Sequence, residues 1–225
     1  MSARVQLRRT ILAMAQRRQR PGTGSAHQFL TTRTQHMHFP DLTPLLHPVP
    51  WAVVGAAATR LYMPERMTQD LDILVRAADA ATVRQQLRAA GCQYIGDLAI
   101  GGSSWTTPDG WPLDVLEGTA PWCTRAIAEA QQNRDAQGLP VVPLSYLVLM
   151  KFQAGRVQDL ADITRMLAQA DEHNLAVVRQ LFATLLPEDV ADLESLIALG
   201  QLEMPAPPAA EAEDDGSPKA DEAHL

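Results

Sequence analysis

Two aspartates separated by one residue, Asp70 and Asp72, are the residues in this chain whose type and spacing point most directly to chemistry. In a β-strand, side chains at positions i and i+2 lie on the same face, so both carboxylates would lie together while Leu71 and Ile73 face the core. Two adjacent negative charges repel, and a divalent cation such as Mg²⁺ neutralises them through the oxygen ligands that it prefers. The spacing therefore indicates a metal site, and a solvated strand face is the alternative.

Asp114 is a third strand carboxylate, because its apolar neighbours Leu113 and Val115 would point to the opposite face. Three carboxylates on neighbouring strands can hold two metal ions, which clamp the attacking and leaving oxygens of a phosphoryl displacement. We therefore predict that Asp70, Asp72 and Asp114 bind Mg²⁺ or Mn²⁺. The alternative for Asp114 alone is an edge charge in solvent.

Gly55 lies between an apolar strand, 51–54, and an alanine-rich helix, 56–62. A glycine at such a junction lets a phosphate approach the backbone, and the helix N-terminus adds N–H donors and a favourable dipole. The alternative is a glycine that the turn alone requires. The order strand–Gly–helix, strand–Asp-x-Asp and strand–Asp is more specific than any one of these features.

The hydrophobic pattern predicts an α+β fold in which a sheet-forming segment precedes a helical one. The expected strands are 51–54, 71–75, 94–100, 104–106 and 111–116, and the expected helices are 1–19, 56–62, 78–90, 121–132, 143–154, 159–170, 174–185 and 187–199. From this order we predict four segments, which are a basic arm and linker at 1–47, a mixed-sheet core at 48–118, a helical domain at 119–202 and a disordered acidic tail at 203–225.

Charge is distributed unevenly along the 225 residues, whose net charge is −7. Residues 1–40 carry seven arginines and no acid, which suits binding to RNA or to an acidic partner protein. The alternative is a helix whose arginines face water and whose apolar residues dock on the core; these are Val5, Leu7, Ile11, Leu12 and Met14. No apolar run approaches the roughly 20 residues of a membrane helix. Because two cysteines cannot build a disulfide scaffold, we expect a cytoplasmic protein that does not enter membranes.

Three strings together resemble the nucleotidyltransferase superfamily that includes DNA polymerase β. They are Val53-Val54-Gly55-Ala56, Arg66-Met67-Thr68-Gln69-Asp70-Leu71-Asp72-Ile73 and Leu113-Asp114-Val115. Within the superfamily, the sequence is most similar to the AbiEii-type nucleotidyltransferases, toxins of bacterial toxin–antitoxin and abortive-infection systems, whose Arg-x-Thr-x-Asp-h-Asp string (h, apolar) it shares. A second shared element runs from Lys151 through Gly155-Arg156 to Asp162. The resemblance covers residues 48–170.

The resemblance implies a nucleotidyltransferase-like fold and a metal-dependent transfer of a nucleoside monophosphate from an NTP to a hydroxyl. The acceptor would be an RNA 3′ end, a protein or a small molecule, and a cognate antitoxin would be a partner. By position, Asp70 and Asp72 would hold the metals, and Asp114 would help to deprotonate the acceptor. The residues implied to contact the nucleotide are Gly55, Ala56, Arg66 and Lys151.

Several of these residues have a structural interpretation that stays open. Lys151, on an otherwise apolar helix, could reach a phosphate, or its head could reach solvent or pair with Asp159. Arg66 could orient phosphate or pair with a neighbouring acid. Asp159 and Asp162 are expected to support a helix start.

The competing function is a non-catalytic nucleotide-binding or antitoxin-like module of the same fold. The family usually has Gly or Ser where this chain has Ala56, so a side-chain hydroxyl for phosphate is lost there. This departure favours the non-catalytic module, whereas the complete set of three aspartates favours the enzyme.

Overall fold

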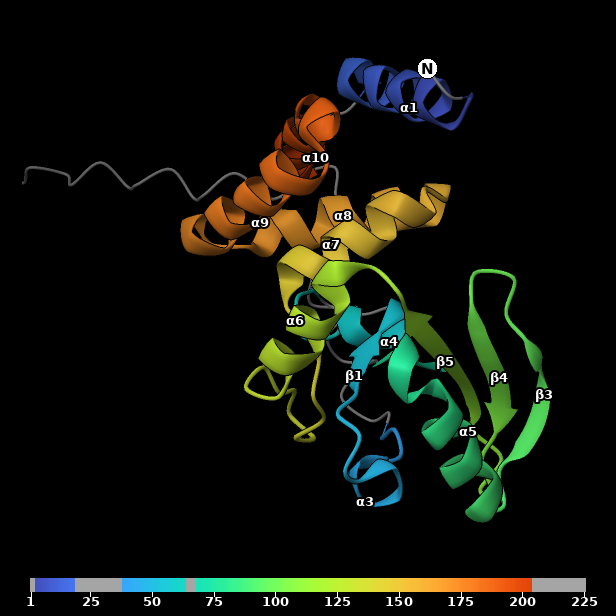
Figure 1. The fold of residues 1–225 in the computed structure, drawn as a ribbon. Coiled ribbons are helices and arrows are strands. Elements are labelled where there is room, and N and C mark those ends of the chain that lie inside the picture. The colour runs from blue at the N-terminus through green and yellow to red at the C-terminus, as the bar shows by residue number, and fades with distance from the viewer. Residues whose placement is uncertain (1–2, 19–37, 64–67, 204–225) are drawn as a thin grey trace, which may run out of the picture.

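The computed structural model describes residues 3–18, 38–63 and 68–203. A five-stranded sheet lies in the lower part of the molecule in Figure 1, the helices α7 to α10 lie above it, and α1 lies at the top. Arg66 and the expected acidic tail beyond Glu203 lie outside the described residues. No helix among the described residues has the length and apolar character needed to cross a membrane.

The sheet is mixed, with the strand order β1-β2-β5-β4-β3. β2 and β5 are parallel, and every other neighbouring pair is antiparallel. The strands are β1 (Ala52–Val54), β2 (Leu71–Arg76), β3 (Gln93–Asp97), β4 (Gly102–Thr106) and β5 (Pro112–Gly118). The side chains of Ile73 and Val115 are fully buried, because β2 and β5 lie inside the sheet and a helix covers the face that these residues share.

Short helices connect the strands and cover the sheet. They are α3 (Thr43–Leu46), α4 (Gly55–Thr59), η1 (Ala77–Asp79), α5 (Ala80–Ala89) and α6 (Pro121–Ala130). Val83 and Leu87 of α5 are buried because residues four apart lie on one side of a helix. The guanidinium of Arg88 lies over the Trp105 ring of β4, so α5 packs on the sheet face that Trp105 shares.

The helical unit follows the sheet along the chain. It contains α7 (Leu144–Ala154), α8 (Val157–Gln169), α9 (Glu172–Leu185), η2 (Pro187–Asp189) and α10 (Val190–Glu203). Phe152 of α7 meets Phe182 of α9 edge to face, with ring centroids 5.0 Å apart. One continuous apolar core joins these helices to the sheet. The domain boundary at 118/119 therefore stays a prediction.

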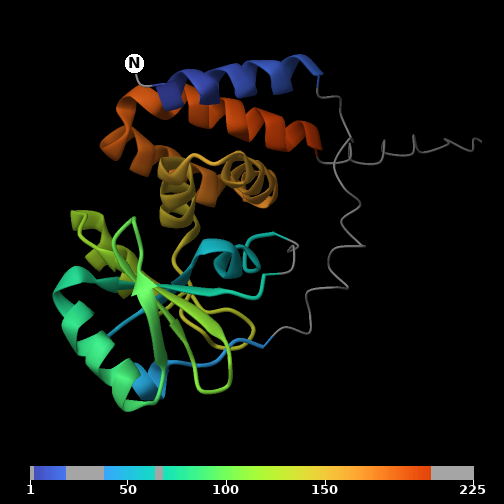
Figure 2. The same cartoon turned by 90° about the vertical axis from the view of Figure 1, so that its right-hand side faces the viewer.

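α1 (Ala3–Arg18) packs on α10 at the end of the molecule farthest from the sheet (Figures 1 and 2). Leu12 is buried and Ile11 is partly buried, whereas Leu7 and Met14 are exposed. The expectation of an apolar docking face is thus confirmed at Ile11 and Leu12 and wrong at Leu7 and Met14.

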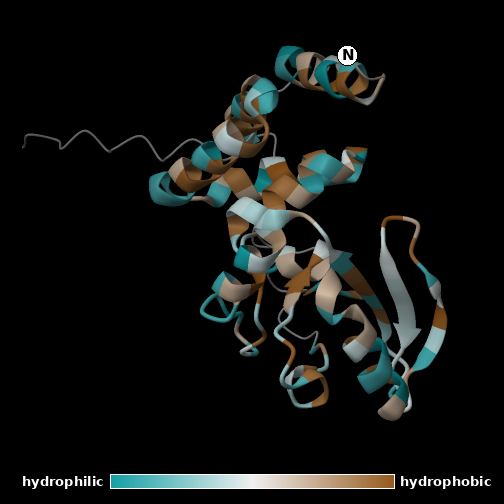
Figure 3. Cartoon of the chain, in the orientation of Figure 1, coloured by the Kyte–Doolittle hydropathy of each residue, from teal (hydrophilic) through white to brown (hydrophobic). Residues whose placement is uncertain are grey.

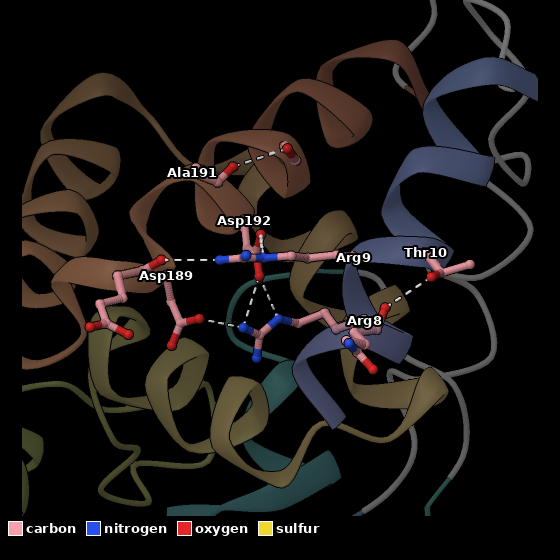
Figure 4. Close-up of polar contacts among 9 residues, drawn as sticks. Arg8, Arg9, Thr10, Asp189, Ala191 and Asp192 are labelled. Atoms are coloured by element: carbon pink, nitrogen blue, oxygen red, sulfur yellow. Dashed lines mark hydrogen bonds and ion pairs between the residues drawn. The ribbon is translucent and has the colours of Figure 1, made fainter. Parts of the chain in front are cut away.

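Two arginines of α1 contact acidic residues of the helical unit, as Figure 4 shows; the side chain of Arg8 is 11% exposed and that of Arg9 is 42% exposed. Arg8 donates from Nε to Oδ2 of Asp192 at 2.8 Å, and its Nη2 also bonds Asp189. Arg9 donates to the other oxygen of Asp192 at 3.3 Å. The guanidinium of Arg8 lies over the Phe152 ring, 4.1 Å from its centroid. The expectation that the arginines of a docked helix face water is therefore wrong for Arg8.

The predicted α+β fold class and the order of elements are confirmed. Element ends differ where backbone hydrogen bonds close a turn. The strand expected at 94–100 ends at Asp97, because Gly101 N–H bonds the Leu98 carbonyl and closes the β3–β4 turn. The helix expected at 56–62 is only the five residues Gly55–Thr59, so its dipole is small.

Candidate active site

Asp72 and Asp114 are direct register partners on the parallel strands β2 and β5. Cross-strand partners present their side chains to the same face, so the two carboxylates lie next to each other. Asp70 comes immediately before β2 and is exposed. The sheet therefore brings together the three aspartates that the sequence singled out, with Asp70 just outside β2, as the expected strand 71–75 also had it.

Gly55 has its Cα against the carboxylate of Asp72. Its φ is +65°, which side chains of L-residues rarely adopt, and a Cβ at this position would lie 1.8 Å from Oδ2 of Asp72. The backbone N–H of the next residue, Ala56, favours the ionised form of the Asp72 carboxyl and so lowers its pKa. The turn alone therefore does not account for this glycine, because the carboxylate also leaves no room for a larger residue.

The environment of Asp72 opposes its ionisation. Burial is the largest cause, followed by the charges of Asp114 and Asp70, and together they raise the pKa of Asp72 to about 6. Lys151 and the Ala56 N–H oppose this rise but do not cancel it. Asp72 is half-buried, so its carboxylate is only partly solvated.

Lys151 is buried at the C-terminal end of α7, between the sheet site and α8. Its Nζ lies 2.8 Å from Oδ2 of Asp162 and 3.6 Å from Oδ1 of Asp159, and both carboxylates are buried. Its charge also reaches Asp72, whose pKa it lowers. The closer partner is thus Asp162 and not the expected Asp159, and the predicted contact to a nucleotide stays a prediction.

Arg156 is a residue of the site that the sequence did not assign a role. Its side chain is 77% exposed and bonds Asp159, with Nε 2.7 Å from Oδ2. The bond to Asp159 chiefly, and the charge of Asp72 more weakly, raise the pKa of Arg156. The sequence clue to this position was Gly155, because a glycine in the left-handed conformation commonly ends a helix. In the structure, Gly155 has a φ of +64° and ends α7, and Arg156 is the residue that caps the start of α8.

Whether these aspartates can bind a metal depends on how closely their side chains converge and on the chemistry of their donor atoms. Within the described ranges, no three His, Cys, Asp or Glu side chains converge closely enough to form a finished metal site. The donor chemistry nevertheless suits a divalent cation, because Asp72 and Asp114 are adjacent acceptor-only groups whose repulsion raises the Asp72 pKa. Arg66 lies in the undescribed segment 64–67, so its predicted role stays a prediction.

Three solved structures show what this chain is similar to. ANT(2″)-Ia in complex with adenylyl-2″-tobramycin is 20% identical, with 68% of this chain and 87% of that chain covered and a TM-score of 0.37. The solution structure of the antibiotic-resistance factor ANT(2″)-Ia is 19% identical, with 68% and 82% covered and a TM-score of 0.36. A candidate nucleotidyltransferase from Thermotoga maritima is 13% identical, with 64% and 91% covered and a TM-score of 0.36. No protein-family model and no curated protein matches the sequence. Similarity this low carries no argument about function, so the function must be argued from the site itself.

Proposed function

We propose that the chain is a metal-dependent nucleotidyltransferase that moves a nucleoside monophosphate from an NTP to an acceptor hydroxyl. The observation that carries the proposal is the adjacency of Asp72 and Asp114 on parallel strands, with the Cα of Gly55 pressed against Asp72. A purely structural pair of carboxylates would be expected to have a counter-charge that offsets their repulsion, whereas Asp72 is half-buried beside like charges whose effect on its pKa Lys151 does not cancel.

Each residue has a distinct task in this proposal. Asp70, Asp72 and Asp114 would hold Mg²⁺ or Mn²⁺, which supplies charge neutralisation at the transferring phosphate. Gly55 leaves room for the Asp72 carboxylate to lie against the backbone at the start of α4. The exposed cation of Arg156 interacts with the charge of Asp72, so phosphate oxygens bound at the aspartates would be its partners.

The proposed reaction is an in-line substitution at the α-phosphorus. The acceptor oxygen forms a bond to that phosphorus, the bond to the α–β bridging oxygen breaks, and pyrophosphate leaves. Asp114 accepts the proton of the acceptor hydroxyl. Since the protein forms no covalent bond, positioning and electrostatic stabilisation provide the rate enhancement.

The biological setting of the proposal comes from the AbiEii-type resemblance of residues 48–170. The Arg-x-Thr-x-Asp-h-Asp string and the Lys151–Asp162 element support a toxin of a toxin–antitoxin or abortive-infection system. A cognate antitoxin would then be the regulatory partner, and it would act by limiting access to the carboxylates.

A non-catalytic nucleotide-binding module is the second candidate, and Ala56 is the observation that favours it. Ala56 offers phosphate no hydroxyl, and its N–H already favours the ionised form of Asp72. Such a module would bind NTP in the presence of metal but release no pyrophosphate.

The test is incubation of the protein with each of the four α-labelled NTPs, Mg²⁺ and total cell extract, with pyrophosphate release measured in parallel. We expect label transfer with at least one NTP and its loss in EDTA. Asp114→Asn should slow transfer more than it weakens NTP binding. Asp109→Asn is the matched control, because Asp109 is an exposed aspartate in the turn before β5. Metal-dependent NTP binding without pyrophosphate release would replace the enzyme with the binding module.

A further inference from the structure

The face of the sheet that carries the aspartates continues onto β4 and β3. Ser104 is the register partner of Asp114, just as Asp114 is the partner of Asp72, so the three side chains share one face across three strands. Thr106 lies two residues further along β4 on the same face, and Gln93 of β3 is its partner. We refer to Ser104, Thr106 and Gln93 as the hydroxyl strip.

The two hydroxyls of the hydroxyl strip make no hydrogen bond that would stabilise the described part of the fold. Ser104 and Thr106 are half-buried, and neither hydroxyl has a hydrogen-bond partner among the residues that the structure describes. The hydroxyls next to them in sequence do have structural bonds. Ser103 accepts the indole N–H of Trp105 at 2.9 Å, and Thr107 accepts the N–H of Trp111 at 3.0 Å. The chain therefore satisfies the hydroxyls on the opposite face and at the strand end and leaves those beside Asp114 available.

The strands that carry the strip contribute no positive charge of their own. Residues 89–124 include no Lys, Arg or His and four acids. Figure 3 shows β4 near the middle of the hydropathy scale along its length, in keeping with its Gly, Ser and Thr residues. A polyphosphate backbone is bound through Lys and Arg contacts that release counterions. These strands provide none, and the two arginines of α5 that contact them are already engaged. Arg84 pairs with Asp97 and Glu117, and Arg88 lies over the Trp105 ring on the opposite face.

Arg8 and Arg9 of the basic arm do not bring positive charge to the hydroxyl strip. Arg8 and Arg9 are bonded to acids of η2 and α10, at the end of the molecule away from the sheet. Arg17 and Arg18 are exposed in the last turn of the same helix. The interpretation of the arm as an RNA-binding segment therefore gains no support at the strip from Arg8 or Arg9.

We propose that the hydroxyl strip is the acceptor subsite and that the acceptor is a small polyhydroxylated molecule, neutral or amine-bearing, without phosphate. Ser104 and Thr106 are two residues apart on one strand, about 7 Å, which matches one sugar-sized ring. Hydroxyl and amide groups both donate and accept, so they can fix several hydroxyls of such a ring and direct one at Asp114. The proposal rests on the proposed function, because Asp114 is its general base.

The first experiment separates the acceptor classes. Cell extract is divided into a low-molecular-mass filtrate, the protein fraction and total RNA, and each is incubated with α-labelled NTP, Mg²⁺ and the full-length protein. Label is expected in the filtrate, on a product that resists ribonuclease and protease. Label confined to RNA or to protein would overturn the small-molecule acceptor while leaving nucleotidyl transfer intact. Absence of label in all three fractions would overturn both proposals.

The second experiment tests the strip. Ser104→Ala and Thr106→Val each remove one hydroxyl with little change of shape. Each is expected to raise the apparent KM for the filtrate acceptor about tenfold, the effect of one lost hydrogen bond, with NTP binding unchanged. Thr184→Val is the matched control, because Thr184 is exposed on α9 and bonds only its own helix. An unchanged acceptor KM in both strip variants, with thermal unfolding at the wild-type temperature, would overturn the assignment of the strip.

Discussion

Charge is arranged in opposite ways at the two ends of the molecule. Where α1 meets α10, Arg8 lies between Asp189 and Asp192, so opposite charges satisfy each other within the chain. On the sheet, Asp72 faces Asp114 and Asp70, which carry the same sign, and its pKa rises to about 6. The first arrangement stabilises the fold and needs nothing else. The second costs stability, which points to a ligand from outside the chain.

Lys151 lies between these two arrangements. It is paired within the chain, to Asp162 at 2.8 Å, yet its charge also reaches Asp72. Phe152, the next residue, carries the guanidinium of Arg8 on its ring. Neighbouring residues of α7 therefore contact both regions: Phe152 contacts Arg8 of α1, and Lys151 interacts with the charge of Asp72 on the sheet.

The largest effect is expected at the unpaired charges. Asp72→Asn should reduce nucleotidyl transfer by at least about a thousandfold, because the neutral amide no longer holds a metal against the phosphate. The fold should persist, since the substitution removes repulsion with Asp114 and Asp70. Initial rates and circular dichroism of the purified variant measure both. Wild-type rates in a folded Asp72→Asn protein would show that these carboxylates are not catalytic.

The next largest effect is expected at Lys151. Lys151→Met leaves Asp162 buried without its closest cation, and breaking a buried pair in this way costs about 3–5 kcal/mol of unfolding free energy. Chemical denaturation gives the value. Asp162→Leu in the same chain should recover much of the loss, because it removes the buried charge that was left behind. If Lys151→Met alone had the stability of the wild type, solvent would have to reach the Lys151–Asp162 pair.

Much of the sheet site could be predicted from the sequence because strand geometry is local. The side chains of a strand alternate between two faces, so Asp72 and Asp114 were placed on strands correctly, with Asp70 just before β2. The fit of Gly55 against Asp72 could not be predicted, because it depends on the register between β1 and β2. The burial of Asp72 likewise depends on how α4 packs against β2, which the sequence pattern does not show.

The contacts of the basic arm, residues 1–40, could not be predicted from the sequence. Seven arginines without an acid in residues 1–40 suggested a surface for a polyanion, but composition does not reveal which arginine finds a partner 180 residues away. Arg8 and Asp192 meet only because α1 and α10 pack together. Arg156 was missed for a related reason, since its proximity to Asp72 requires the turn at Gly155.

A smaller effect is expected at the paired charges of α1. Arg8→Met should lower the unfolding free energy by about 1–3 kcal/mol, because Asp192 is largely buried and loses its closest donor. Arg17→Met is the control, since Arg17 is exposed in the last turn of the same helix. Denaturant midpoints of the two variants provide the comparison. Equal midpoints would mean that the α1–α10 contact contributes no net stability.

The smallest effect concerns pH and tests the unpaired charges without any substrate. The pKa of Asp72 is raised in the folded protein relative to the unfolded chain, so its ionised form costs stability above about pH 6, and this cost disappears as the pH falls toward 4. Metal-free Asp72→Asn should therefore be more stable than the wild type at pH 8, by on the order of 1–2 kcal/mol after solvent screening. The difference should shrink toward zero between pH 6 and pH 4, where the wild-type carboxyl becomes neutral. Thermal unfolding in EDTA across this range measures it, with Asp109→Asn as an exposed control that shows no such trend. A difference that stays constant from pH 8 to pH 4 would mean that Asp72 ionises normally, and the contrast between the paired and unpaired ends of the molecule would then lose its electrostatic basis.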